Sequence, residues 1–251
     1  KLKNQLEPLI KENVLEFLFY EVEMPLVYVL CGMEKSGVRI DVEALHKLSV
    51  DFTKKLAEIE DSVFKLVDCK FNLSSPKQVG EIIFEKLQIV ENAKKTKTGQ
   101  YSTSEEVLES LRGKHEVIDL ILEYRGIKKL LSTYVDSLPT LINSKSGKIH
   151  TSFNQTITAT GRLSSSNPNL QNIPIRDDYG KEIRKAFIAD KDCYLLAADY
   201  SQIELRLLAH FSNDAQMVSD FNSGIDIHSS TASKIFKVEL SEVTSDMRRK
   251  A

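Results

Sequence analysis

The first half of the chain alternates apolar and polar positions in the three- and four-residue steps of amphipathic helices. Between Asp41 and Cys69 the apolar residues keep this spacing, which predicts one long helix with Asp41 as its N-cap. The stretch SSPKQVGEIIFEKL predicts a second helix, capped by Ser75 and with Pro76 at its first position. Both helices carry an apolar stripe, so we expect them to share a core.

A polar, basic segment with one glycine, NAKKTKTGQYSTS, separates these helices from the next ones. Thr103 and Glu106 have the spacing of a capping box, which predicts a helix that starts at Thr103. A further long helix is predicted from about His115 to Pro139, where proline ends it.

The pattern changes in the second half. GKIHTSFNQTITAT alternates with a period of two and is rich in β-branched residues, so it predicts a strand. A long loop, GRLSSSNPNLQNIPIRDDYG, follows, and KAFIADKDCYLLAADY predicts two strands joined by the turn DKD. SQIELRLLAHFS and DIHSSTASKIF return to helical spacing. A helical first half and a β-containing second half predict an α+β fold.

Composition is that of an ordinary globular protein: 251 residues, 41% hydrophobic and 28% charged, enough for one large domain or two smaller ones. The formal net charge of -2 means that any polyanionic partner must be held by local patches. The three scattered cysteines include no C-x-x-C pair, which argues against a disulfide framework or a zinc site and favours the reducing cytoplasm.

The richest apolar stretch, VLEFLFYEVEMPLVYVL, is broken by three glutamates and a proline, so no membrane span is predicted. No signal peptide is recognisable. The chain begins with Lys1 rather than Met and stops at Ala251 within a helical pattern, which suggests a fragment of a longer protein.

The stretch DYSQIELR begins at Asp199, directly after the apolar run CYLLAA, and carries two carboxylates. Ser201 and Glu204 have capping-box spacing, so Glu204 could reach back to the backbone of Ser201. On a helical wheel Glu204 also points between Leu208 and Phe211, where a carboxylate loses solvation and needs a partner. The two interpretations are compatible.

Asp199 is open to more than one interpretation. We expect it to end the strand YLLAA and to project from the sheet edge where the next helix begins. Strand ends of this kind commonly hold metal and phosphate chemistry, but Asp is also a common turn residue. Spacing alone leaves both possibilities open.

A longer match surrounds this stretch. TATGRLSSSNPNLQNIPIR together with DYSQIELR resembles the first two polymerase blocks of the family A DNA polymerases, the bacterial DNA polymerase I type. Further pieces follow that family's order, and the resemblance runs from about Glu21 to Ala251: EMPLVYVL…GVRID, FNLSSPKQ, KKTKTGQYSTSEEVL, ILEYRGIKKLLSTY, DIHSSTASKIF and VTSDMRRKA.

The resemblance implies a polymerase with right-hand architecture: a helical thumb, a palm with an antiparallel sheet, and fingers that are truncated here. It implies the following division: 1–22 the tail of an exonuclease-like domain, 23–44 a palm-entry helix and linker, 45–125 thumb, 126–213 the first part of the palm, and 214–251 the start of the fingers.

The resemblance also implies a catalytic and nucleotide-binding set. Asp199 would be the catalytic residue and would ligate two Mg²⁺ ions, with the backbone carbonyl of Tyr200 as a further ligand. Glu204 would act as a steric gate against a ribose 2′-hydroxyl. The residues implied to contact the incoming nucleotide are Tyr200, Ser201, Gln202, Glu204, His228 and Arg248.

A second implied set binds DNA. Arg162, Asn169, Asn172 and Arg176 would line the minor groove of the primer–template, where forked arginine and amide groups can meet acceptors common to every base pair. On the thumb tip, Lys95 and Lys97, with Lys94 beside them, would touch backbone phosphates. Without the resemblance a surface salt bridge is the preferred interpretation of each arginine. The lysines then fit a solvated loop, and His228, Arg248 and Arg249 fit polar helix surfaces.

The implied function is template-directed DNA synthesis by a monomer whose partners are primer–template DNA and deoxynucleoside triphosphates, with no membrane. The family's second catalytic acid belongs to a later His-Asp-Glu block, so these 251 residues alone are expected not to polymerise. The alternative is a non-catalytic module that binds primer–template DNA. A 3′–5′ exonuclease fits less well because its paired acidic motifs are not seen.

Overall fold

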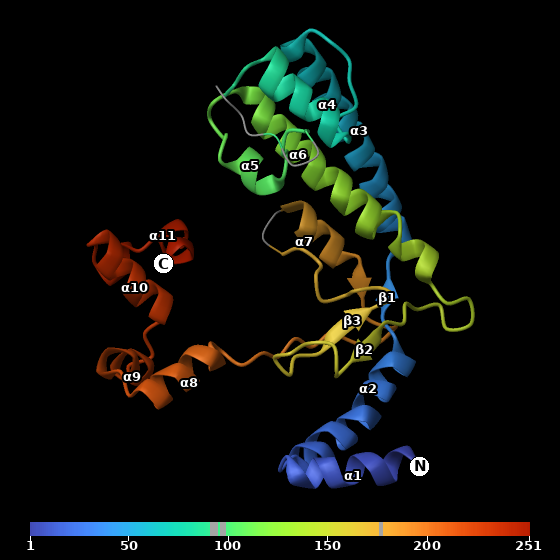
Figure 1. Cartoon of the computed structure of the whole chain (residues 1–251), viewed down its shortest axis with the longest axis vertical. Coiled ribbons are helices and arrows are strands. Elements are labelled where there is room, and N and C mark those ends of the chain that lie inside the picture. The colour runs from blue at the N-terminus through green and yellow to red at the C-terminus, as the bar shows by residue number, and fades with distance from the viewer. Residues whose placement is uncertain (91–94, 96–98, 176–177) are drawn as a thin grey trace. The chain divides into compact units, whose positions relative to one another are not determined.

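The computed structural model describes residues 1–90, 95, 99–175 and 178–251, and it divides into two compact units. Unit 1 is Lys1–Leu195 and unit 2 is Leu196–Ala251 (Figure 1). Among the described helices, none is both long enough and apolar enough to cross a membrane.

Unit 1 begins with three consecutive helical segments: α1 (Leu2–Glu12), a π-helical stretch (Leu18–Glu23) and α2 (Met24–Ser36). No side chain of α1 is buried, and only Leu30 is buried in α2. The apolar positions of these helices are therefore mostly exposed, in contrast to those of the helices that follow.

The core of unit 1 lies between α3 (Val42–Val67) and α6 (Glu116–Leu130), which run side by side (Figure 1). The α3 N-cap is Asp41, as predicted, and its carboxylate accepts a 3.0 Å hydrogen bond from the Ala44 amide. The apolar stripe of α3 is buried against α6, where Ile118 and Ile121 are fully inaccessible. Each such side chain contributes roughly 1.5–3 kcal/mol of burial free energy.

Two short helices flank this pair. Helix α4 (Pro76–Gly80) is capped by Ser75 as predicted and continues into a π-helical turn, Glu81–Lys86. Helix α5 (Glu105–Glu109) starts one residue later than predicted, because its cap is Ser104. Thr103 is instead buried, and both its carbonyl and its hydroxyl accept hydrogen bonds from Arg125.

The predicted long helix up to Pro139 is present, but its helix type changes along its length. His115 caps α6, which passes into a π-helical stretch (Leu131–Val135) and then a 3₁₀ turn (Leu138–Leu141). Helix α7 (Asp178–Lys185) packs against both α3 and α6.

Two small antiparallel sheets complete unit 1. Strand β1 (Arg39–Ile40) pairs with β4 (Phe187–Ile188). Strand β2 (Ser152–Asn154) pairs with β3 (Ser164–Ser166), with Phe153 opposite Ser165. The predicted strand within residues 147–160 is therefore present, although it is short.

The second strand predicted in KAFIADKDCYLLAADY is wrong. Residues 193–200 have no regular structure, and Tyr194 and Leu196 are 96% and 92% exposed. A strand needs the backbone groups of a neighbour to complete its ladder, and none of the described strands pairs with this segment.

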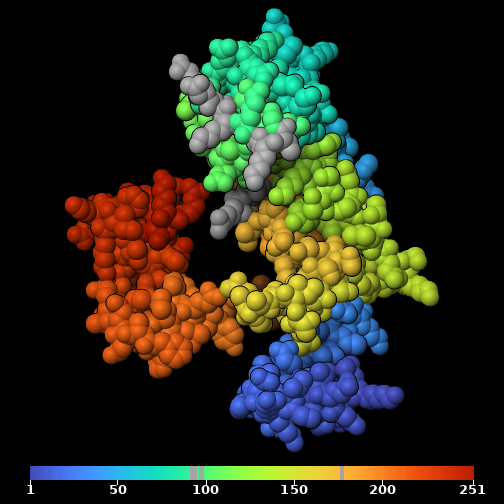
Figure 2. All heavy atoms as spheres, in the orientation of Figure 1, coloured from blue at the N-terminus to red at the C-terminus, as the bar shows by residue number. Residues whose placement is uncertain are grey.

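Unit 2 contains four helices in the part of the chain that the structure describes: α8 (Ile203–Ser212), α9 (Ala215–Asn222), α10 (Ile227–Phe236) and α11 (Ser245–Lys250), with a 3₁₀ turn at Leu240–Glu242. Helices α8 and α10 were both predicted. Figure 2 shows the atoms of these helices, coloured orange to red, as one continuous body.

The predicted start of α8 is wrong in detail. Its N-cap is Gln202, in the left-handed conformation with φ 53°, and no side chain closes a capping box from Ser201. The apolar wall expected around Glu204 is not buried either, since Leu208 is 53% exposed and Phe211 80% exposed. The helical period was correct, but a period alone does not say whether anything covers the apolar side.

Candidate functional site

The candidate site residues fall into two groups that coincide with the two units. All those predicted to serve catalysis or the nucleotide, from Asp199 to Arg248, belong to unit 2. Those predicted to bind DNA, from Lys95 to Asn172, belong to unit 1.

Within unit 2, two of the predicted nucleotide-binding residues meet on one carboxylate, that of Asp226. The Gln202 amide donates to Oδ2 of Asp226 at 2.7 Å. Arg248 donates to both oxygens, from Nε to Oδ1 at 3.0 Å and from Nη2 to Oδ2 at 2.9 Å. Asp226 also caps α10 by accepting from the Ser229 amide at 2.8 Å and from its hydroxyl at 3.0 Å. This cluster joins the starts of α8 and α10 to α11.

The electrostatics of the cluster follow from this pairing. The Arg248 guanidinium holds the pKa of the Asp226 carboxyl well below its usual range, with smaller support from Ser229 and Gln202. In return, the hydrogen bond to Asp226 raises the pKa of Arg248. Both groups are therefore charged at neutral pH.

Arg248 and its neighbour Arg249 have different surroundings. Arg248 crosses to an element 22 residues earlier in the chain, whereas Arg249 pairs at 2.5 Å with Asp246 of its own helix. The interpretation of this helix as a uniformly solvated basic face therefore holds for Arg249 but not for Arg248.

Asp199 and Tyr200 lie in the exposed segment before α8. Among the described residues, none hydrogen-bonds to the Asp199 carboxylate, and no group of three or more His, Cys, Asp or Glu side chains could hold a metal ion. A carboxylate and a backbone carbonyl are nevertheless the hard oxygen donors that Mg²⁺ prefers, usually together with phosphate oxygens of a substrate. The donor set fits a magnesium ion whose remaining ligands come from elsewhere.

The other predicted residues of unit 2 are placed as follows. The Ser201 carbonyl accepts from Nε of Arg206 at 2.9 Å. Glu204 lies in the first turn of α8 and is exposed. His228 lies in the first turn of α10 and is half-buried.

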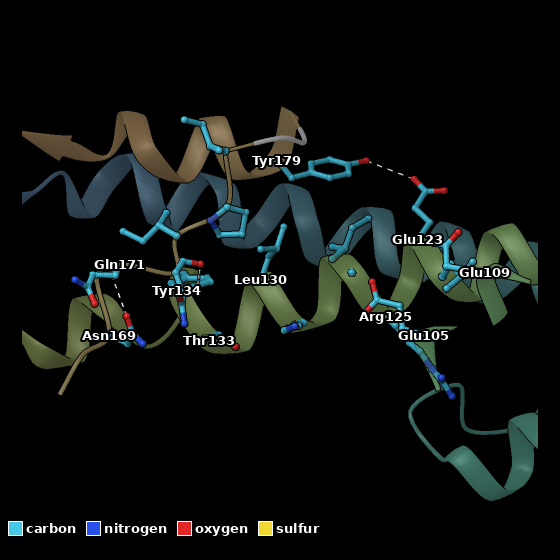
Figure 3. A pocket seen from close by; sticks show the side chains of 18 of the residues that line it. Glu105, Glu109, Glu123, Arg125, Leu130, Thr133, Tyr134, Asn169, Gln171 and Tyr179 are labelled. Carbon is cyan, nitrogen blue, oxygen red and sulfur yellow. Dashed lines mark hydrogen bonds between the residues drawn. The ribbon is translucent and has the colours of Figure 1, made fainter. Parts of the chain in front are cut away.

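Unit 1 contains a groove of about 1290 Å³ between α6 and the loop of residues 168–175. Asn169 and Asn172 of that loop line it. Their contact with a DNA minor groove stays a prediction. Figure 3 shows Asn169, Gln171 and Tyr134 towards one end of the groove and Glu105, Glu109 and Arg125 towards the other. Arg162 is exposed and is not among the residues that line this groove.

Buried hydroxyl groups fix the loop that carries the two asparagines. Thr151 and Ser165 are both buried and hydrogen-bond to each other at 2.7 Å. Thr151 also donates to the Pro168 carbonyl, and the Leu170 amide donates to Ser165. Further along, the Tyr134 hydroxyl donates to the Asn172 carbonyl at 2.6 Å. The backbone of the loop is thereby held against α6.

Two of the three glutamates among the described lining residues, Glu109 and Glu123, are paired with basic side chains. Glu109 binds Arg112, and this pairing lowers the pKa of the Glu109 carboxyl. Glu123 forms a 3.5 Å ion pair with Lys55 and accepts from the Tyr179 hydroxyl, also at 3.5 Å (Figure 3). Such pairing limits the repulsion that these carboxylates would exert on a polyanion in the groove.

The predicted lysine contacts of the thumb tip are only partly described. Lys95 lies 4.6 Å from the centre of the Tyr101 ring and 3.4 Å from a carboxylate oxygen of Glu85. Lys94, Lys97 and Arg176 lie outside the described residues.

Sequence reasoning missed four residues that the structure brings into these sites. Lys129 and Thr133 line the groove four residues apart on one side of α6 and its continuation, and Arg125 precedes them by four. That i, i+4, i+8 polar stripe, on a helix whose apolar side is buried, was a usable signal. Asp226 was not singled out, and nothing in the sequence pairs it with Arg248.

Comparison with known proteins gives matches along most of the chain. The family model for DNA polymerase family A matches residues 42–251. The thermostable DNA polymerase I of Thermus filiformis is 48% identical over 251 residues, which is 100% of this chain and 30% of that protein. DNA polymerase I of Bacillus subtilis is 51% identical over 235 residues, 93% of this chain and 26% of that protein.

A solved structure is also similar: the POL domain of Pol1 from M. smegmatis in complex with DNA primer-template and dNTP. Its TM-score is 0.86 at 39% identity, covering 97% of this chain and 43% of that one. The chain thus spans about a third or less of the length of these two polymerase I relatives. With a family model matched over most of its length, the chain belongs to the family A DNA polymerases.

Proposed function

We propose that this chain forms the thumb, the first part of the palm and the start of the fingers of a template-directed DNA polymerase. The observation that carries the proposal is the division of the candidate residues. A groove in unit 1 presents asparagine side chains suited to a minor groove, and unit 2 presents Asp199 together with Arg248, whose guanidinium group is suited to a triphosphate.

In this proposal the groove holds the primer–template duplex without reading its sequence. Amide groups such as those of Asn169 and Asn172 can donate to the minor-groove acceptors that all base pairs share. Lys129 adds a positive charge for the phosphate backbone, which dominates affinity for DNA. Binding is therefore expected to weaken as salt concentration rises.

Asp199 and the Tyr200 carbonyl would hold magnesium. When bound, Mg²⁺ polarises the attacking 3′-hydroxyl and stabilises negative charge on the transferred phosphate and the leaving pyrophosphate. Arg248 and His228 bind the triphosphate of the incoming nucleotide, and Glu204 excludes a ribose 2′-hydroxyl. A two-metal site needs more carboxylates than Asp199, so we expect the 251 residues by themselves not to extend a primer.

Primer extension tests this function in the full-length polymerase. Asp199→Asn removes one negative charge with little change in size, and we expect incorporation to fall by about 100-fold or more because charge stabilisation at the transferred phosphate is lost. Asp192→Asn is the matched control, since Asp192 is also an exposed acid of the same segment. Retention of activity by Asp199→Asn would contradict the proposal.

The alternative, a non-catalytic primer–template-binding module, is favoured by one observation: among the described residues, no group of three His, Cys, Asp or Glu side chains could hold a metal ion. It predicts salt-dependent duplex binding by a full-length protein that incorporates no nucleotide under any divalent metal.

A further inference from the structure

We infer that Asp226 is a positioning residue for the nucleotide site: it holds Arg248 by one edge of its guanidinium group and leaves the other edge for the triphosphate. This inference rests on the proposed polymerase function and assigns a role to a residue outside the set predicted to touch the nucleotide.

The geometry of the pair is the first support. An arginine guanidinium has two hydrogen-bonding edges, one formed by Nε and Nη2 and the other by Nη1 and Nη2. Asp226 takes the first edge, through Nε at 3.0 Å and Nη2 at 2.9 Å. The second edge can still bind two phosphate oxygens in the parallel manner typical of arginine. A bound phosphate therefore need not break the contact with Asp226.

The second support is that the Asp226 carboxylate is fully used. It accepts from five donor atoms: Nε and Nη2 of Arg248, the amide and hydroxyl of Ser229, and the Gln202 side chain. A carboxylate offers about four lone-pair positions, so little acceptor capacity remains for a metal ion. This saturation argues for a role in orienting neighbours rather than in ligating magnesium.

The third support is where the cluster is anchored. Asp226 is the N-cap of α10, so its position is fixed by the helix, and Gln202 ties the same carboxylate to the start of α8. The Arg248 side chain, on the short helix α11, is 47% exposed even with this contact. A long exposed side chain loses rotamer freedom when it binds a ligand, and Asp226 imposes part of that restriction beforehand.

One effect opposes this role, because the negative charge of Asp226 repels a triphosphate. That repulsion acts through a partly solvated region, where the Asp226 side chain is 34% exposed, and it is offset by the adjacent arginine charge. We therefore expect the orienting effect to exceed the repulsion, and the sign of the mutational effect decides between them.

The test is the KM for the incoming nucleotide in single-nucleotide incorporation by the full-length polymerase. Asp226→Asn keeps a good helix cap but loses the two-point acceptance of Arg248. We expect KM to rise about 10-fold, with kcat changed less than about twofold. In an Arg248→Ala background the same substitution should change KM by less than about twofold, because Asp226 acts through Arg248.

Asp214→Asn is the matched control. Asp214 caps α9 through a 2.8 Å bond from the Met217 amide, and no arginine contact accompanies it. It should leave KM unchanged. A fall in KM on Asp226→Asn would show that the contact competes with the nucleotide and overturns the inference. No change, or an equal change in both backgrounds, overturns it as well. If the wild-type protein incorporates nothing, the proposed function itself has failed.

Discussion

The two units are stabilised in different ways. In unit 1 the helices α3 and α6 bury a continuous set of apolar side chains, of which Leu45, Ile118 and Ile121 are completely inaccessible. In unit 2, all of whose residues the structure describes, the buried apolar side chains are only Ala209, Ile227 and Ala232. Its helices are instead held together by hydrogen bonds to aspartate carboxylates.

Two aspartates accept these hydrogen bonds in unit 2. Asp220 is buried and accepts from the Ser230 hydroxyl at 2.6 Å, which lowers the pKa of its carboxyl. Asp226 joins α8, α10 and α11 as described above. The difference between the units matches their proposed tasks: a packed scaffold suits a groove that holds a duplex, and a polar network suits orienting charged groups towards a nucleotide.

The largest expected contrast is in core truncation. Ile121→Ala removes a fully buried side chain of α6 and should lower the free energy of unfolding of unit 1 by about 2–5 kcal/mol. Leu208→Ala in unit 2 removes a side chain that is 53% exposed and should cost well under 1 kcal/mol in the 251-residue chain. Urea unfolding followed by circular dichroism measures both. Equal losses would remove the distinction between the units.

Much of unit 1 could be predicted from sequence because its helices follow from local patterns. The apolar period of α3 and the caps Asp41 and Ser75 are local properties, and all three are confirmed. The strand expected at residues 194–198 is not formed, because a strand depends on a partner that local sequence does not specify. The domain limits inferred from the resemblance remain predictions.

The candidate site was predictable only in part. The resemblance named Gln202 and Arg248, but not that both bind Asp226. Gln202 lies 24 residues before Asp226 and Arg248 lies 22 residues after it, so no local sequence pattern links them. The groove likewise depends on the loop at residues 168–175 lying along α6, more than 30 residues earlier in the chain.

A smaller effect is expected from pH in unit 2. Because the folded-state pKa of Asp226 is lowered, its ionised form stabilises the fold above the unfolded-state pKa, which is about 3.9, and that contribution is lost as the pH falls towards the folded value. Wild type should exceed Asp226→Asn in stability by about 1 kcal/mol above pH 5, with the gap closing below pH 4. Thermal unfolding across this range measures the gap, and one that widened in acid would contradict the assignment.

The last contrast concerns one hydrogen bond at the groove. Tyr134→Phe removes the hydroxyl that holds the Asn172 carbonyl, at a cost of about 1 kcal/mol. We expect the dissociation constant for primer–template to rise about fivefold. Tyr124→Phe is the matched control, since that buried tyrosine of α6 donates to Glu60 and does not line the groove. Equal weakening by both variants would assign the effect to general loosening of the helix.

The most direct measurement compares Tyr134→Phe and Asp226→Asn in the same full-length polymerase, recording the primer–template dissociation constant and the nucleotide KM for each. The account predicts that Tyr134→Phe weakens duplex binding and leaves KM within about twofold, whereas Asp226→Asn raises KM and leaves duplex binding within about twofold. If each variant shifted both constants alike, the proposed division between a DNA groove in unit 1 and a nucleotide site in unit 2 would be contradicted.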